Sequence, residues 1–210
     1  MTATPLLGAF VTGTDTGVGK TVVSAVLARA WDADYWKPVQ TGLEEDLGDT
    51  AAVAELAGQA AGRIIAPRHA LARPLSPHVA AEAEGVRIAL DDFALPETNR
   101  PLVVEGAGGL LVPLNETELM ADLIARLGLP AVLAVRDRLG AVNHALLSLE
   151  ALRARAIPVM GLVMVGGPFA DNAEIIVRHG NAPVLLRLEW VDPLTPARIE
   201  AWAEQVRALA

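Results

Sequence analysis

The chain has 210 residues, 52% of them hydrophobic, with a formal charge of −8 and no cysteine. This length and apolar content suffice for one sizeable core, so a single domain over residues 1–210 is the simplest organisation. The acidic balance argues against a nucleic-acid-binding or anionic-membrane surface, the first apolar run is too short for a signal or a membrane span, and the absence of cysteine suits a reducing cytoplasm.

Short apolar runs rich in β-branched residues alternate with helical patterns along the chain. In chain order, we expect strands at Leu6–Val11, Tyr35–Val39, Leu102–Val104, Ala131–Val135, Val159–Val165 and Val184–Leu186. We expect helices at Thr21–Ala30, Glu118–Leu127, Gly140–Ala156 and Pro196–Leu209, and a further helical segment beginning near Asp49. Runs of consecutive apolar residues are typical of parallel strands covered on both faces. The sequence therefore predicts a doubly wound α/β domain whose mostly parallel sheet is flanked by helices, with a loop or a short edge strand in Arg63–Pro77.

The first expected strand runs into a glycine-rich turn, Gly13-Thr14-Asp15-Thr16-Gly17-Val18-Gly19-Lys20-Thr21. Glycines let backbone N–H groups converge on phosphate oxygens, the next helix directs its positive end at them, and Lys20 and Thr21 supply a cation and a hydroxyl for Mg²⁺. A bare Gly-Lys-Thr also occurs in ordinary exposed turns, and this loop is one residue longer than the usual spacing. The strand, loop and helix context nevertheless favours a phosphate site of the P-loop NTPase type.

Three charged residues follow other strands or begin a helix, at the edge of the sheet where ligands gather. Lys37 and Glu105 come at the ends of two apolar runs, and Asp49 lies at the start of a helical segment. Each has a purely structural alternative, because Asp49 could be an N-cap, with Asp46 then the metal ligand, and Lys37 could extend its head into solvent. Glu105 follows a buried run, where a carboxylate without a partner is costly, so a metal or cation beside it is favoured.

Five motifs resemble those of the dethiobiotin synthetase family: VTGTDTGVGKT at 11–21, WKPVQTG at 36–42, SPH at 76–78, VEGAGG at 104–109 and LGAVNH at 139–144. They occur in the family's order, and the longer phosphate loop is a family feature. The resemblance implies a homodimeric enzyme that converts 7,8-diaminopelargonate, carbon dioxide and ATP into dethiobiotin, ADP and phosphate, with ATP as co-substrate and Mg²⁺ as cofactor. The reaction passes through a carbamate and a carbamic-phosphoric anhydride and belongs to biotin biosynthesis.

The resemblance also implies a role for each matching residue. Lys20, Lys37 and Thr16 are the expected catalytic residues, while Thr21, Asp49 and Glu105 are expected to hold Mg²⁺. Thr41 is expected to contact the reacting groups, and Leu139, Val142 and Asn143, at the start of a helix, to receive the substrate carboxylate from the neighbouring subunit. The active site would then lie at the dimer interface. The nucleotide would contact Gly17, Val18, Gly19, Lys20, Thr21, Val22, Asp49, Glu105, Gly106, Ala107, Gly108, Val165, Glu189 and Trp190.

The chain departs from the family pattern at the expected base-binding end. Val165 stands where relatives often carry an asparagine that contacts adenine, and Glu189 replaces a proline before Trp190. Because one or two base hydrogen bonds are worth roughly 1–3 kcal/mol, we expect relaxed nucleotide choice. Trp190 either flanks the base or packs in the core.

Three other functions are compatible with parts of the sequence. A partition-type switch ATPase shares the expected fold, but such proteins carry a lysine where this chain has Asp15. A related amide-forming synthetase would need a glutaminase domain with a cysteine nucleophile. A nucleotide-binding regulator would not require both Lys37 and Glu105. His144 is expected on a helix surface, and His78 is only a weak candidate for the site.

Overall fold

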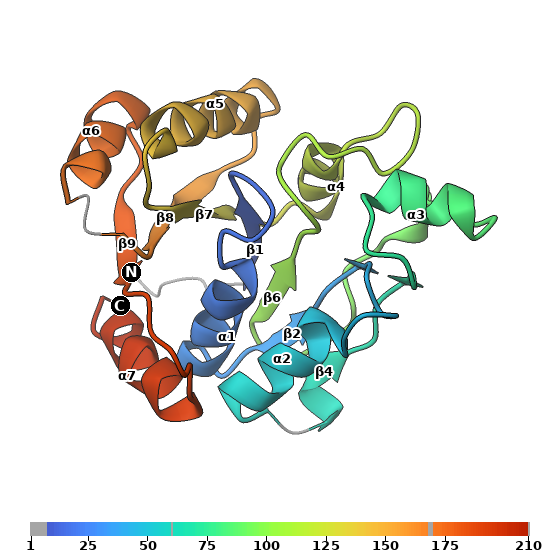
Figure 1. The fold of residues 1–210 in the computed structure, drawn as a ribbon, viewed down its shortest axis with the longest axis horizontal. Coiled ribbons are helices and arrows are strands. Elements are labelled where there is room, and N and C mark those ends of the chain that lie inside the picture. The colour runs from blue at the N-terminus through green and yellow to red at the C-terminus, as the bar shows by residue number, and fades with distance from the viewer. Residues whose placement is uncertain (1–7, 60, 168–169, 210) are drawn as a thin grey trace.

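The computed structural model describes residues 8–59, 61–167 and 170–209, and these form one α/β domain around a seven-stranded sheet (Figure 1). The strand order is β4-β2-β6-β1-β7-β8-β9, and each neighbouring pair runs parallel. The strands are β1 Gly8–Gly13, β2 Asp34–Trp36, β4 Ile64–Ile65, β6 Leu102–Glu105, β7 Ala131–Arg136, β8 Val159–Val165 and β9 Val184–Leu188. The predicted doubly wound, mostly parallel sheet is confirmed.

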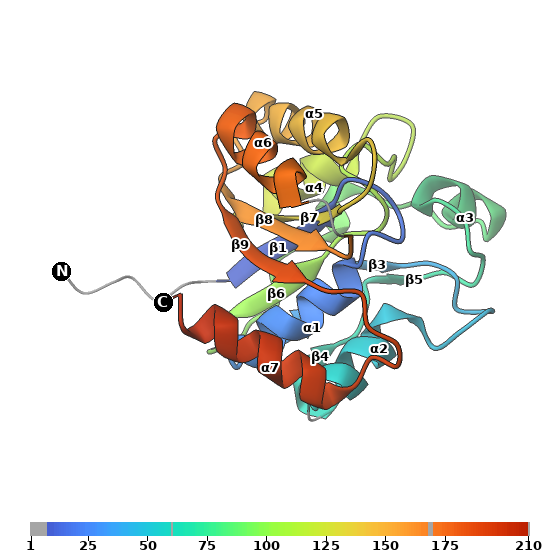
Figure 2. The same cartoon turned by 60° about the vertical axis from the view of Figure 1, so that its left-hand side comes forward.

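Helices cover both faces of this sheet, as the two views show (Figures 1 and 2). One layer consists of α1 Lys20–Ala30, α2 Gly48–Ala57 and α7 Pro196–Arg207, and the other of α4 Met120–Leu127, α5 Ala141–Ala154 and α6 Ala170–Gly180. Each layer buries its own apolar cluster against the sheet, and side chains alternate between the clusters along β1: Phe10 faces the α4 and α5 layer, whereas Val11 faces the α1 and α7 layer. No helix in the described ranges combines the length and apolar content that a membrane span requires.

The strand expected at Tyr35–Val39 is interrupted, and this corrects the prediction. β2 ends at Trp36, and the chain then leaves the central sheet to form β3 Val39–Gln40, which pairs in parallel with β5 His69–Ala70 in a separate two-stranded sheet. Pro38 has no amide hydrogen, and its carbonyl accepts hydrogen bonds from the amides of Arg68 (2.9 Å) and His69 (3.0 Å). The stretch Arg63–Pro77 thus contains the short edge strand β4 and the partner of β3.

Other boundaries differ more modestly from the expectations. α4 begins at Met120 rather than Glu118, because the carbonyl of Glu118 accepts a hydrogen bond from the amide of Leu114 (2.8 Å) and closes a loop. The helix α6 was not predicted, and the 3-10 turns Ala61–Arg63 and Leu90–Asp92 and the short helix α3 Pro77–Ala83 complete the secondary structure. The part of the first expected strand that precedes Gly8 lies outside the described residues.

The position of β1 determines where the functional elements meet. β1 lies between β6 and β7, so the glycine-rich turn that follows it emerges at the middle of the sheet's carboxyl edge. β6 ends beside it, with Glu105 in register with Val11, and α2 begins nearby. Ligands of doubly wound sheets bind at this edge.

Leu133→Ala should lower the free energy of unfolding by about 3 kcal/mol, because Leu133 is fully buried at the centre of β7 and truncation leaves a cavity. Urea unfolding followed by circular dichroism measures this change. Leu209→Ala is the matched control, since Leu209 is exposed and should change the unfolding free energy by less than about 0.5 kcal/mol. Equal effects of the two substitutions would contradict the described core.

Candidate active site

A cleft of about 1140 Å³ opens at the carboxyl edge of the central sheet. Its walls come from the glycine-rich turn, the segments after β3 and β6, the start of α2, the chain before α3, and the residues after β9. Of the residues with an expected role, the following line the cleft: Thr16, Gly17, Val18, Gly19, Lys20, Thr21, Val22, Lys37, Thr41, Asp49, Glu105, Ala107, Gly108, Val165, Glu189 and Trp190.

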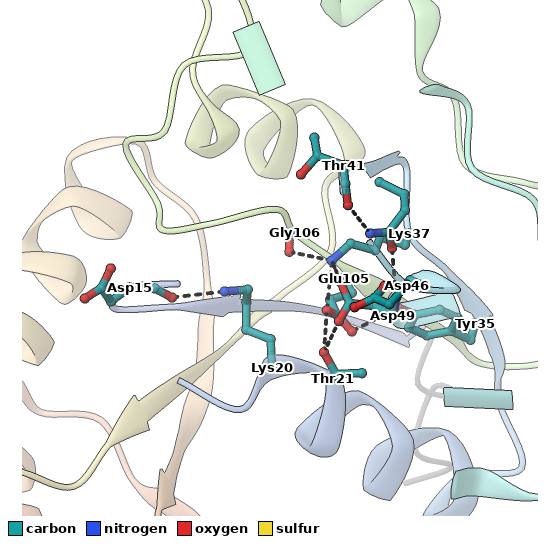
Figure 3. Close-up of polar contacts among 12 residues, drawn as sticks. Asp15, Lys20, Thr21, Tyr35, Lys37, Thr41, Asp46, Asp49, Glu105 and Gly106 are labelled. Carbon is teal, nitrogen blue, oxygen red and sulfur yellow. Dashed lines mark hydrogen bonds and ion pairs between the residues drawn. The ribbon is translucent and has the colours of Figure 1, made fainter. Parts of the chain in front are cut away.

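The glycine-rich turn leads directly into α1, as the sequence predicts. Gly19 precedes the helix with φ 94°, a left-handed conformation, and a Cβ atom there would lie 2.9 Å from Cγ1 of Val165. The side chain of Lys20 folds back over the turn, and its Nζ donates a hydrogen bond to the carbonyl of Asp15 at 3.0 Å (Figure 3). Burial, and then the nearby charge of Lys37, lower the pKa of Lys20 to about 8. An anion in the cleft would therefore find a poorly solvated cation beside free backbone amides.

A buried ammonium group lies next to this turn, between two carboxylates (Figure 3). Nζ of Lys37 is 2.8 Å from Oδ2 of Asp49 and 2.9 Å from Oε1 of Glu105, and it is 3.4 Å from the carbonyl oxygen of Gly106. The side chains of Lys37 and Glu105 are only 4% and 1% exposed. Burial acts to lower the pKa of Lys37, but the charges of Glu105 and Asp49 outweigh it and raise the pKa above its usual value. Lys37 thus remains charged, and the structure excludes the solvent-exposed alternative.

Oxygen atoms of three side chains converge beside Lys37. The hydroxyl of Thr21 donates a hydrogen bond to Oδ1 of Asp49 and lies 3.3 Å from Oε1 of Glu105. Burial would raise the pKa of Asp49, but Lys37 and the Thr21 hydroxyl outweigh it and hold that pKa below its usual value. No cluster of three acidic, histidine or cysteine ligands occurs within the described residues. The donor set fits Mg²⁺, which takes oxygen ligands and commonly completes its shell with water and substrate phosphates.

The choice between the two aspartates follows from their contacts. Asp49 lies in the first turn of α2 and contacts Thr21 and Lys37, whereas the N-cap position of that helix is Leu47. Asp46 is exposed, and its Oδ1 accepts a hydrogen bond from the amide of Gly48 at 2.6 Å. Both aspartates line the cleft, but Asp46 stabilises the turn before α2, whereas Asp49 is the one that contacts Thr21 and Lys37.

The other end of the cleft carries an aromatic side chain beside a cation. Trp190 is 70% exposed, which excludes the core alternative, and Cζ of Arg136 lies 5.4 Å from the centre of its ring. Arg136, Val165 and Leu188 lie side by side at the ends of β7, β8 and β9. The sequence analysis missed Arg136, although its place at the end of an apolar run was a usable signal.

Comparisons with known proteins place the chain in a family. Residues 8–198 match a family model described as an AAA domain. The chain is 51% identical over 191 residues to the ATP-dependent dethiobiotin synthetase BioD of Rhodopseudomonas palustris (strain TIE-1), a match that covers 91% of this chain and 90% of the relative. It belongs to the dethiobiotin synthetase family.

Two further matches define how far the likeness extends. The biotin biosynthesis bifunctional protein BioCD of Bordetella avium (strain 197N) is 54% identical over 202 residues, which are 96% of this chain but only 43% of that relative. A solved structure of the MinC:MinD cell division protein complex of Aquifex aeolicus matches with a TM-score of 0.57 at 11% identity, covering 96% of this chain and 94% of the matched chain. At that identity the structural match supports the fold alone.

Not every residue expected from the dethiobiotin synthetase family lies in the cleft of this chain. Leu139 is 94% exposed, and neither it nor Val142 and Asn143 at the start of α5 lines the cleft. Gly106 contributes its carbonyl to Lys37 rather than a surface of the cleft. His144 is exposed on α5, as expected.

Asp49→Asn should weaken Mg·ADP binding by about tenfold or more while leaving metal-free ADP binding nearly unchanged, because Asp49 is the acidic oxygen donor next to Thr21. Calorimetry with and without Mg²⁺ separates the two affinities. Asp46→Asn is the matched control and should change neither, since the carboxylate of Asp46 bonds to the Gly48 amide rather than to Thr21 or Lys37. A magnesium effect in the Asp46 variant and none in the Asp49 variant would reverse the assignment.

Proposed function

We propose that this protein closes the ureido ring of dethiobiotin from 7,8-diaminopelargonate, carbon dioxide and ATP. The family relationship supports the reaction, and one structural observation supports the site: the buried Lys37 ammonium held between Asp49 and Glu105, beside the phosphate loop. ATP in the cleft would bring its γ-phosphate between Lys20 and Lys37. The cysteine-free composition and these substrates suit a cytoplasmic enzyme.

The chemistry requires three steps. One amine of the substrate adds to carbon dioxide and loses a proton, giving a carbamate. A carbamate oxygen then attacks the γ-phosphorus of ATP, and ADP leaves. Finally the second amine attacks the carbonyl carbon of the mixed anhydride, inorganic phosphate leaves with the bonding electrons, and the ring closes as the amine loses its proton.

The residues of the cleft contribute position and charge to these steps. Lys37 and Lys20 neutralise the carbamate and the oxygens of the transferred phosphoryl group, and the burial of both lysines strengthens their effect. Thr16 and Thr41 line the cleft and supply hydroxyls to the carbamate and the amines. Thr21, Asp49 and Glu105 would hold Mg²⁺, which would neutralise phosphate charge when bound. None of the steps needs a protein nucleophile.

The substrate carboxylate is assigned to a second copy of the chain. Within one chain Leu139, Val142 and Asn143 lie outside the cleft, yet α5 begins there without a side-chain cap, and the first turn of a helix suits an anion. We therefore infer a homodimer in which the Leu139–Asn143 segment of each subunit completes the other subunit's cleft.

Phosphate release by the purified protein with Mg·ATP and bicarbonate, with and without 7,8-diaminopelargonate, tests the proposal. The expected result is release that depends on the diamine, together with dethiobiotin detected by mass. Release that ignores the diamine would point to a switch ATPase or another synthetase. Tight nucleotide binding without release would point to a regulator.

Lys37→Gln should lower kcat by about 100-fold or more while changing nucleotide affinity less than tenfold, because Lys37 serves the transferred group rather than the anchored phosphates. Lys20→Gln is the comparison and should weaken nucleotide binding itself. Steady-state kinetics and calorimetry provide the two quantities. A Lys37 variant that loses nucleotide but keeps its turnover at saturation would contradict the assignment.

Subunit mixing tests the shared site. Lys37→Gln and Leu139→Glu should each be nearly inactive alone, the second because its new charge would repel the substrate carboxylate. If the sites are shared and subunits exchange freely, an equal mixture should recover about a quarter of wild-type activity, since half of the dimers carry one intact site. Light scattering and native mass spectrometry establish the dimer and the exchange. No recovery in proven mixed dimers would show that each subunit builds its own site.

The side chains at the expected base-binding end of the cleft predict that the protein uses ATP, CTP and GTP with similar efficiency. Val165 offers no hydrogen bond to a base, so kcat/KM for ATP, CTP and GTP should agree within about tenfold. Val165→Asn should then raise the preference for ATP by about tenfold or more, in the same diamine-dependent assay. Strict ATP preference in the wild-type protein would contradict this prediction.

A further inference from the structure

Tyr35 makes a buried contact that the reaction scheme does not use. It is the only tyrosine of the chain and has no exposed surface. Its hydroxyl donates a hydrogen bond to Oε2 of Glu105 at 2.9 Å (Figure 3). The contact joins β2 to β6, where Tyr35 is in register with Val103, two residues before Glu105 on the same face of the strand.

The two oxygens of the Glu105 carboxylate therefore have different partners. Oε2 bonds to Tyr35, whereas Oε1 lies 2.9 Å from Nζ of Lys37 and 3.3 Å from the hydroxyl of Thr21. The carboxylate is almost completely buried, so solvent cannot replace a missing partner. A partial rotation of the carboxylate would move both oxygens away from their partners and break both sets of contacts.

We propose that Tyr35 is a positioning residue that holds Oε2 of Glu105 and thereby directs Oε1 toward Lys37, Thr21 and a bound Mg²⁺. The inference rests on the proposed function only in taking Glu105 as a magnesium ligand. Groups that orient a metal ligand through its second atom commonly alter metal affinity by 10–100-fold when they are removed. Tyr35 is suited to this task because it donates a single hydrogen bond from a rigid ring that packing holds in place.

The competing explanation is that Tyr35 only packs in the core. The chain offers a matched control for it on the same strand. Trp36 is also buried, points to the opposite face of the sheet, and donates one hydrogen bond from Nε1 to the carbonyl of Ala66 at 3.2 Å. Trp36→Phe thus removes a partly buried hydrogen bond of β2, and that bond does not involve Glu105.

The first measurement compares Tyr35→Phe and Trp36→Phe in Mg²⁺-dependent ADP binding, with melting temperature as the measure of stability. Tyr35→Phe should raise the Mg²⁺ concentration needed for half-maximal binding by about tenfold and leave metal-free ADP affinity unchanged. Trp36→Phe should lower the melting temperature without changing the magnesium requirement. If Tyr35→Phe lowers only stability, or if both variants alter magnesium binding equally, the positioning role is overturned.

The second measurement uses the unique tyrosine as a probe. Wild-type protein labelled with ¹³C at the tyrosine Cζ should give one resonance. Mg·ADP should shift it beyond any effect of ADP alone, because a metal on Oε1 withdraws charge from the acceptor of the Tyr35 hydrogen bond. An identical resonance with ADP and with Mg·ADP would overturn the proposal. Both measurements omit the diamine and turnover, so they can succeed even if the proposed synthetase reaction fails.

Discussion

The architecture of the cleft depends on one buried ammonium group. Lys37 and Glu105 are almost completely removed from water, and a charge in that position is tolerated only with close, well-oriented partners. The ammonium group and its two partners come from three places: Lys37 follows β2, Glu105 ends β6, and Asp49 lies in the first turn of α2. The distances of 2.8 and 2.9 Å therefore restrict how these elements are placed relative to one another. A shift of any one of them would leave a buried charge unpaired.

The same arrangement places a second buried cation, Lys20, at the cleft, where an anion would contact it. Lys20 lies close enough to Lys37 for their charges to oppose each other, and the side chain of Lys20 finds only the Asp15 carbonyl as a hydrogen-bond acceptor among the described residues. Burial acts on Lys20 more strongly than the charge of Lys37, so phosphate oxygens in direct contact would give this poorly solvated cation a close partner. Tyr35 contacts the other oxygen of Glu105, the one that does not face Lys37. Burial, and then the charge of Glu105, raise the pKa of Tyr35 well above its usual value, so its hydroxyl keeps its proton.

The positions of side chains that follow from neighbouring residues could be predicted from the sequence, whereas contacts that depend on pairing across the fold could not. The glycine-rich turn and the charged residues after the apolar runs are local patterns, and parallel topology brings such strand ends together. Tyr35 resembles an ordinary core residue in sequence, because nothing local shows that its hydroxyl meets Glu105, 70 positions away. Pro38 removes one amide hydrogen, but the break in the strand also needs the amides of Arg68 and His69, which only the folded chain supplies. The segment at Leu139 could be recognised by its motif, yet within one chain it lies outside the cleft.

The walls of the cleft come from two separate sheets, the seven-stranded central sheet and the two-stranded sheet of β3 and β5. The phosphate loop and Glu105 belong to the seven-stranded sheet, whereas Thr41 and the residues before α3 that line the cleft continue from the two-stranded sheet. Substitutions in β3, in β5 or in the cleft-lining residues that follow them alter a wall that shares no strand pairing with the seven-stranded sheet. Substitutions in that wall would therefore leave the strand pairing of the seven-stranded sheet intact. Lys37 lies between β2 and β3, where the chain passes from one sheet to the other, so its position depends on both.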